Sequence, residues 1–135
     1  MSEDNRKHLE FVQGVIARMA NNSFSLKAWS VTILAGLFAL TAGKAIPRVA
    51  VLPVLIFWIL DAYFLGKERQ YRNLYDHLRK LSAKEWEDLG DRRYSLAPTD
   101  YGLKAERLVK VMMRATLVAL YGALLASIVI YGMLR

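Results

Sequence analysis

Hydrophobic positions along the chain fall into three long blocks that are separated by polar, mostly basic segments. The blocks cover residues 28–43, 49–66 and 115–134, and Asp61 is the one charged residue inside them. A helix needs roughly 20 apolar residues, and no fewer than about 17, to cross a bilayer. Helices that are apolar on every face are typical of lipid-embedded spans. The pattern predicts an all-α integral membrane protein with three transmembrane helices.

Between the blocks, hydrophobic residues recur at helical spacing. Residues 3–22 predict an amphipathic helix, and the polar run NNSFS at 21–25 predicts a break before the first span. This helix either packs on its own protein or lies in the membrane interface. After the second block the helical pattern continues to residue 81, which predicts one helix over about 49–81 that extends on the order of 50 Å. Its lower half carries a stripe that suits the N-terminal helix: Tyr71, Leu74, Tyr75, Leu78 and Leu81.

The segment at 67–114 contains a clear helix start. Ser82 and Glu85 have the spacing of a capping box, with Leu81 and Trp86 placed to form a hydrophobic staple, and Gly90 fits a C-terminal cap. A loop over 91–100 then leads into a last helix that we expect to run straight into the third span. Residues 1–135 thus form a single membrane-embedded domain, in which 1–27 and 67–114 build a cytoplasmic helical module.

Charge sets the expected orientation. Of the 19 Lys and Arg residues, 16 lie in 1–27 and 67–114, and the other 3 are Lys44, Arg48 and Arg135. The positive-inside rule then places the N-terminus in the cytoplasm and the C-terminus outside. Charges throughout 1–27 predict that the first span is a retained anchor, not a removed leader.

Composition excludes several kinds of chemistry. The chain has no cysteine, and its two histidines, His8 and His77, lack metal-ligand spacing. No nucleotide-binding or hydrolase motif occurs. We therefore predict no enzymatic activity, no metal and no cofactor. Acidic residues interspersed with the basic ones in 67–114 also argue against nucleic acid as a partner.

Asp61 is the first candidate site, because an ionisable residue inside a span is costly and marks a functional hypothesis by default. Arg114 and Lys110 lie at the matching depth on the third span, and Lys27 lies at the mouth of the first. One interpretation is a pair of Asp61 and Arg114 that holds the helices together. The alternative is a polar lining for an ion or proton path.

Two further sets of residues are candidates for contact. Small residues recur in two spans, which lets helices approach closely within one chain or between chains: Ala35, Ala39, Gly43, Ala119, Gly122, Ala123 and Ala126. A basic set is either a solvated face that fixes orientation or a binding site for an anion such as a lipid headgroup or a nucleotide: Arg69, Arg72, Arg79, Lys80, Arg92 and Arg93.

The strings HLEFVQGVIARMANNSF, LKAWSVTILAGLFAL and FWILDAYFLGKERQYRNLYDHL resemble a family of small bacterial inner-membrane proteins without an assigned activity. More loosely, the layout is similar to SLATT-type membrane effectors, which implies a pore-forming role in phage defence. This chain departs from that layout by its third span. We therefore expect a homo-oligomeric channel or effector gated through its cytoplasmic helices. The alternative is a non-conducting scaffold that recruits a soluble partner through residues 67–107.

Overall fold

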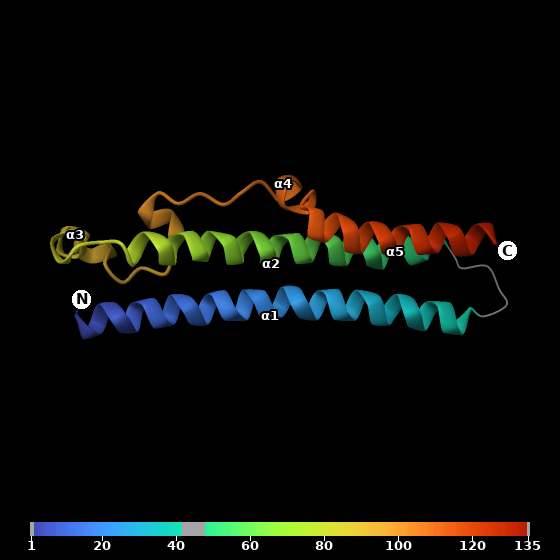
Figure 1. The fold of residues 1–135 in the computed structure, drawn as a ribbon, viewed down its shortest axis with the longest axis horizontal. Helices are drawn as coiled ribbons and strands as arrows, with labels where there is room; N and C mark the ends of the chain where they lie inside the picture. Colours follow the sequence, from blue (N-terminus) through green and yellow to red (C-terminus); the bar gives the residue numbers. More distant parts are fainter. Residues whose placement is uncertain (1, 42–47, 135) are drawn as a thin grey trace.

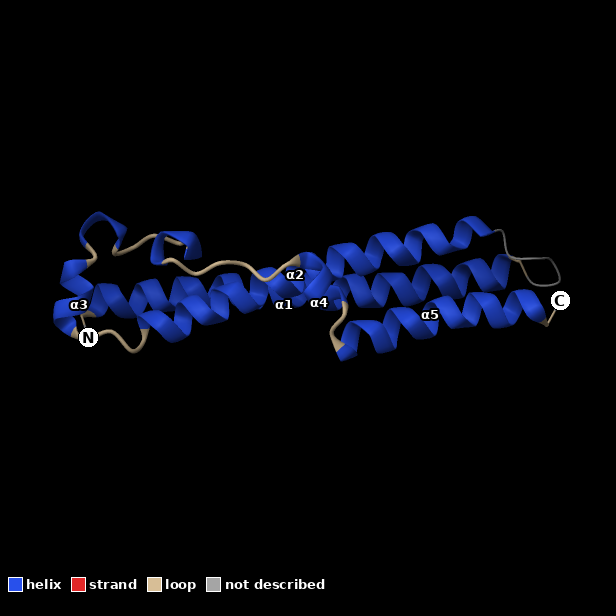
Figure 2. Ribbon diagram, turned by 90° about the horizontal axis from the view of Figure 1, so that it is seen from above, coloured by secondary structure: helices blue, strands red, loops and turns tan. Residues whose placement is uncertain are grey.

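The computed structural model describes residues 2–41 and 48–134, and these form helices and loops without a strand. Helix α1 (Glu3–Leu40) and helix α2 (Val51–Leu78) form a long antiparallel hairpin (Figure 1). Helix α5 (Ala115–Met133) lies beside the hairpin on one half of its length, and the two ends of the chain lie at opposite ends of the molecule (Figures 1 and 2). The structure thus confirms the all-helical class.

Helix α1 is continuous over 38 residues, so the predicted break at 21–25 is wrong. None of those five residues is glycine or proline. Asn and Ser cost only about 0.5 kcal/mol each relative to Ala in a helix, and packing along α2 offsets such costs. At the start of the helix, the Ser2 hydroxyl accepts a hydrogen bond from the Asn5 N–H at 3.2 Å.

Helix α2 follows the 3₁₀ turn η1 (Arg48–Ala50) and confirms the predicted long helix, with ends at Val51 and Leu78. Pro53 lies in its first turn, where a helix needs no N–H donor. The predicted stripe of α2 packs against α1, so the N-terminal part of α1 packs on its own protein. The buried residues of this contact are Leu9, Val12, Leu74, Leu78 and Trp86.

Helix α3 (Ala83–Asp88) confirms the predicted capping box. The Ser82 hydroxyl accepts from the Glu85 N–H at 3.3 Å, and the Glu85 carboxylate accepts from the Ser82 N–H at 2.7 Å. Gly90 follows the helix with a left-handed φ of 52°. Trp86, which is 1% exposed, anchors this short helix in the core shared with α1 and α2.

The expected continuous last helix is wrong. The chain forms the 3₁₀ turns η2 (Gly90–Arg92) and η3 (Pro98–Tyr101), an irregular stretch over 103–107 and the short helix α4 (Leu108–Met112) before α5. Gly102, with a φ of 73°, ends η3. The Tyr101 hydroxyl donates to the Arg92 carbonyl at 2.6 Å, and the Gln70 side-chain amide donates to the Leu103 carbonyl at 3.0 Å. These contacts hold residues 91–107, here called the return segment, along α2 (Figure 1).

The molecule has two halves of different character. The polar half contains the first part of α1, the second part of α2, α3 and the return segment. The apolar half contains the rest of α1, the first part of α2 and α5, side by side in Figure 2. Its core is formed by Leu34, Ala50, Val54, Ala62, Val111, Leu117, Tyr121 and Ile128.

Two helices, α1 and α5, are long and apolar enough to cross a membrane, and only 17% of the most apolar 18-residue stretch of each is buried within the chain. Large apolar side chains of both helices are exposed, among them Trp29, Leu40, Val129 and Ile130. The 19 residues of α5 extend about 28 Å, close to the roughly 30 Å of a hydrocarbon core. Helix α2 does not meet the same criterion, because its apolar part covers only 51–66 and includes Asp61.

Candidate functional site

One carboxylate connects all three helices of the apolar half. Asp61 of α2 is fully buried, and the Lys27 ammonium group of α1 lies 2.8 and 2.7 Å from its two oxygens. The Ser23 hydroxyl of α1 donates to Oδ1, and the Tyr121 hydroxyl of α5 donates to Oδ2 at 3.0 Å. Lys27 also donates to the Ser23 hydroxyl at 2.8 Å. We call these four residues the Asp61 cluster.

The sequence of α1 places its share of the cluster on one face. Ser23, Lys27, Ser30 and Leu34 follow one another at intervals of four, three and four residues, the repeat of a helix surface. Ser30 donates to the Lys27 carbonyl at 2.7 Å, so its hydroxyl is satisfied within the helix. Leu34 continues the same face into the apolar core. Polar and apolar contacts to α2 therefore follow one another along a single stripe.

The environment of the cluster is dry on the carboxylate side. The Asp61 side chain is 0% exposed, whereas the Lys27 side chain is 30% exposed. A buried charge without a partner costs several kcal/mol, so the ammonium group and two hydroxyl donors are what make this carboxylate tolerable in the core. Because both of its oxygens are used within the chain, Asp61 acts here as a junction between helices.

An aromatic pair lies against the cluster. The rings of Trp58 and Tyr121 stack with centroids 5.9 Å apart and planes 9° from parallel. The Trp58 indole N–H donates to the Met112 carbonyl at 3.1 Å, which links α2 to α4. The stack fixes the Tyr121 ring, and the ring in turn directs its hydroxyl at Asp61.

An ion pair at Asp61 was predicted correctly, but the partner of Asp61 is Lys27 and not Arg114. Arg114 stands at the start of α5 and donates two hydrogen bonds to the Glu106 carboxylate, both at 2.9 Å. Lys110 lies 4.0 Å from the same carboxylate. The break in the helix before α5 turns Arg114 towards the return segment, while the uninterrupted α1 brings Lys27 to Asp61. Glu106 also accepts from Arg69, and the hydrogen bonds from Arg114 lower its pKa.

Sequence reasoning missed the roles of Ser23, Tyr121 and Trp58. The signal for Ser23 was its spacing of four residues from Lys27, which places both side chains on one helix face. Tyr121 lies about two helical turns inside the third apolar block, and a buried phenol needs a polar partner. Its pairing with a residue 60 positions away depends on how the helices pack, which no local pattern encodes.

Most of the six basic candidates bind acidic or other polar groups of the chain itself, which favours the solvated-face interpretation. Arg69 pairs with Glu106 at 3.3 Å, Arg72 with Glu68 at 2.7 Å and Arg79 with Asp76 at 2.8 Å. Lys80 is exposed, Arg92 donates to the Asp100 carbonyl at 3.3 Å, and Arg93 donates to the Asn5 side chain at 3.3 Å.

The small residues of the spans lie mainly on outward faces. The exposed ones are Ala35 and Ala39 on α1 with Ala119, Ala123 and Ala126 on α5. Gly122 is half-buried, and Gly43 lies outside the described residues. Contacts between helices within the chain use larger side chains, as in the core of the apolar half.

These features define an all-helical protein with two helices able to cross a membrane and a buried ion pair at the junction of its helices. Within the described ranges 2–41 and 48–134, no three His, Asp or Glu side chains gather as a metal site requires. No protein-family model, curated protein sequence or solved structure matches the chain. The geometry therefore has to carry the functional proposal.

Proposed function

We propose that this chain is a three-span protein of the bacterial inner membrane that forms homo-oligomers and perturbs the membrane as a pore-forming effector. Its polar half is the cytoplasmic module that controls the spans. A role in phage defence belongs to the same proposal through the resemblance to SLATT-type effectors. The observation that carries the proposal is the Asp61 cluster, which joins α1 to α2. Both helices continue without a break from the polar half into the apolar half.

Three spans are supported by the position of α2. Its first part contacts both α1 and α5 and packs with them in one core. It also presents a row of large apolar side chains outward: Leu52, Leu55, Ile56, Ile59 and Leu60. If α1 and α5 cross a bilayer, residues 51–66 must lie in the same layer. The buried pair of Asp61 with Lys27 removes the net charge that would otherwise keep this segment out of lipid.

Orientation is supported by the distribution of charge. The 16 basic residues of 1–27 and 67–114 belong to the polar half and to its boundary, and the positive-inside rule places that side in the cytoplasm. Self-association is supported by the outward small residues, because small side chains are what allow helices to approach closely in lipid.

Control of the spans by the module is supported by the continuity of the helices. Packed helices transmit a displacement along their length when they have two discrete arrangements. Here, a movement of the polar half would separate Lys27 from Asp61, and the loss of that pair would favour an arrangement in which α1 moves away from α2. The cluster is thus the element that biases the closed state.

A dye-release experiment tests this function. The protein is reconstituted in liposomes that contain a self-quenched dye, and we expect dye release that increases when Lys27→Gln removes the ammonium group from Asp61. Arg79→Gln is the matched control, because Arg79 pairs with Asp76 on the exposed surface of the polar half. Liposomes that stay sealed with wild-type protein and with both variants would overturn the proposal.

A second candidate, the non-conducting scaffold, is favoured by a separate observation. A hollow of about 360 Å³ opens at the end of the polar half and is lined by Asp4, Lys7, His8, Phe11, Tyr94 and Leu96. Phe11 is 67% exposed there, so most of its ring has no cover from the chain. A photo-crosslinking residue in place of Leu96 tests this candidate in cells. A single soluble partner in stoichiometric amount supports the scaffold, and capture of the chain's own copies alone argues against it.

A further inference from the structure

Helix α4 has a position and a surface that the proposed function does not explain. It lies crosswise over α2, between the polar and apolar halves (Figures 1 and 2). Its inner face is fixed to α2: Val111 is 1% exposed within the core of the apolar half, and the Met112 carbonyl accepts from Trp58 at 3.1 Å. The short helix is therefore a built part of the fold, with a defined outer face.

The outer face of α4 is apolar to an unusual degree for its length. Leu108 is 40% exposed, Val109 is 70% exposed, and Met113, directly after the helix, is 66% exposed. Three large apolar side chains thus point away from the protein within six residues. Exposure of these three side chains to water is unfavourable, whereas contact with lipid removes their apolar surface from water.

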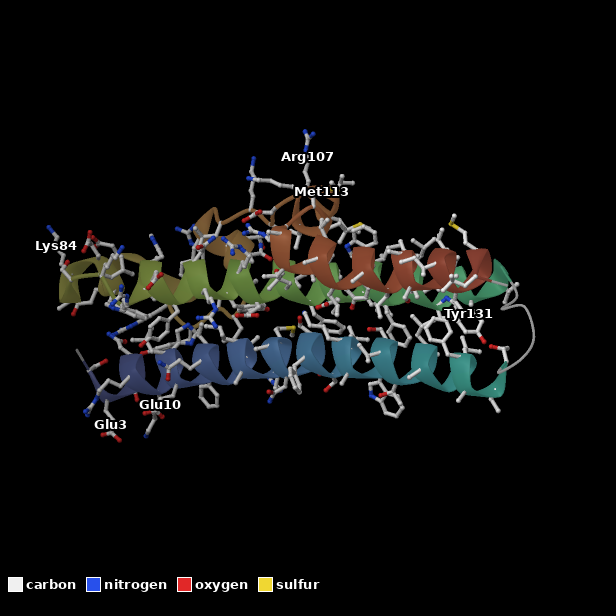
Figure 3. All side chains as sticks on the ribbon, turned by 45° about the vertical axis from the view of Figure 1, so that its right-hand side comes forward. Glu3, Glu10, Lys84, Arg107, Met113 and Tyr131 are labelled. Carbon is white, nitrogen blue, oxygen red and sulfur yellow. The ribbon has the colours of Figure 1, made fainter. Side chains whose placement is uncertain are left out.

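Basic residues flank these apolar side chains. Residues 103–114 contain four cations, Lys104, Arg107, Lys110 and Arg114, and one acid, Glu106. Arg114 already binds Glu106 with two hydrogen bonds at 2.9 Å. Among the described residues Arg107 makes no ion pair. Lys110 is 74% exposed, and its ammonium group lies 4.0 Å from the Glu106 carboxylate, which is long for an ion pair. Arg107 and Met113 lie together at the outer edge of the molecule (Figure 3). The outer face is therefore apolar and cationic at the same time.

The position of α4 along the long axis of the molecule indicates what covers this face. The helix directly precedes Ala115, where the third apolar block begins, and it contacts α2 near the end of the second block, where Gly66 and Val111 line the same hollow. In a three-span arrangement both relations place α4 at the cytoplasmic surface of the membrane. Apolar side chains with flanking cations at that level are the composition of a helix that lies in the membrane interface. Cations at this surface attract anionic lipid headgroups.

We propose that α4 is an interfacial anchor, in which Leu108, Val109 and Met113 enter the boundary between headgroups and acyl chains and Arg107 and Lys110 bind anionic phospholipid. This inference rests on the three spans of the proposed function. It assigns lipid contact to residues other than the six basic candidates of the sequence, several of which are paired with acids. A soluble partner or a second copy on the same face is the competing occupant.

The experiment uses the absence of cysteine from the chain, which makes single labels clean. Full-length Val109→Cys protein carries an environment-sensitive fluorophore in nanodiscs, and brominated phosphatidylcholine and brominated phosphatidylglycerol serve as quenchers. We expect quenching by both lipids and a preference for phosphatidylglycerol. Replacing Arg107 and Lys110 together by Gln should reduce that preference about fivefold for each cation removed. Replacing Lys80 and Lys84 by Gln, which removes one exposed cation between α2 and α3 and one in α3, should leave it unchanged.

A second label, on Val129→Cys protein, separates this inference from the proposed spans. Val129 of α5 is 59% exposed and lies inside the third apolar block. Quenching of the label at position 129 with no quenching at position 109 would overturn the anchor alone, including the case in which a protein partner covers it. No quenching at either position would overturn the spans themselves. Equal quenching of the label at position 109 by the two lipids would overturn the role of Arg107 and Lys110.

Discussion

Asp61 illustrates how a single residue can hold three helices in register. Its carboxylate is completely buried and still accepts hydrogen bonds from α1 on one side and α5 on the other. In a core of low dielectric, each of these bonds is strengthened, and the loss of any one leaves a polar atom without water. The cluster should therefore respond to mutation as a unit, with single changes more costly than paired ones.

The ion pair itself is tested by a double-mutant cycle. Lys27→Met should destabilise the protein by roughly 3 kcal/mol, because it leaves the buried Asp61 charge uncompensated. The double variant with Asp61→Asn should recover most of that loss, since it removes the second charge as well. The measurement is unfolding by denaturant in detergent, followed by circular dichroism. Additive effects of the two changes would show that Lys27 and Asp61 do not depend on each other.

The phenol of Tyr121 can be examined without disturbing its ring. Tyr121→Phe keeps the stack with Trp58 and removes the hydroxyl that donates to Asp61 at 3.0 Å. A hydrogen bond to a charged group contributes about 1.5–3 kcal/mol, and we expect a loss of that size in the same unfolding experiment. Tyr63→Phe is the control, because Tyr63 is 50% exposed. Equal effects at the two tyrosines would argue against a role for the Tyr121 hydroxyl.

His8 should make the polar half sensitive to acid. Burial lowers the pKa of His8 below its ordinary value of 6.5, and a hydrogen bond to the Ser95 backbone offsets part of this effect. The native state therefore binds a proton less readily than the unfolded state, so stability is constant above about pH 6.5 and falls as the pH drops below it. The thermal midpoint in detergent should decrease over that range.

His8→Phe removes this titration and keeps the edge contacts with the rings of Trp86 and Tyr94. We expect a thermal midpoint that depends less on pH for this variant. His77→Gln, at an exposed position of α2, should behave as the wild type. A decline that is the same for all three proteins would assign the acid sensitivity to other groups.

At the scale of elements, the continuity of α1 is the feature that builds the site. A break at 21–25 would have rotated Lys27 relative to the first part of the helix, whereas the observed helix carries Ser23, Lys27 and Leu34 on one face towards α2. In the polar run at 21–25, Ser23 is therefore needed for the Asp61 cluster, and the other polar residues are tolerated within the helix.

Neighbouring residues of this run should respond in opposite directions. Asn22 is exposed, and Asn22→Ala should stabilise the protein by about 0.5 kcal/mol through helix propensity alone. Ser23 is 4% exposed and bonded to both Asp61 and Lys27, and Ser23→Ala should destabilise it by about 1–3 kcal/mol. Denaturant unfolding of the two variants provides the comparison. A loss of stability on Asn22→Ala would mean that the run interrupts the helix after all.

The sequence predicted the elements whose signals are local. The periodicity of α2, the capping box of Ser82 and Glu85, and the apolar stripe of α1 all depend on residues within one or two turns. The interruption before α5 was missed because the return segment is held by distant contacts such as that between Gln70 and Leu103. Asp61 was recognised as a candidate site, but its partners depend on the register between packed helices, which spacing along the chain does not encode.

At the scale of the whole molecule, the proposed number of spans determines on which side of a bilayer each end of the structure would lie. The N-terminus lies at the tip of the polar half, and the C-terminus lies at the tip of the apolar half (Figure 1). Three spans place these ends on opposite sides of a bilayer. Two spans would return both ends to one side, which the packing of α2 with α1 and α5 in the core of the apolar half does not favour.

Single cysteines test this arrangement directly. Lys84 lies at the far end of the polar half (Figure 3). In spheroplasts, the thiol of the Lys84→Cys variant should be protected from a membrane-impermeant maleimide and should become labelled after permeabilisation. Met133 is 81% exposed at the end of α5, and the thiol of the Met133→Cys variant should be labelled before permeabilisation. The physical reason is the excess of basic residues, 16 against 3, which opposes transfer of the polar half. Protection of both positions would indicate an even number of crossings, and labelling of the Lys84→Cys variant alone would indicate that the orientation is reversed.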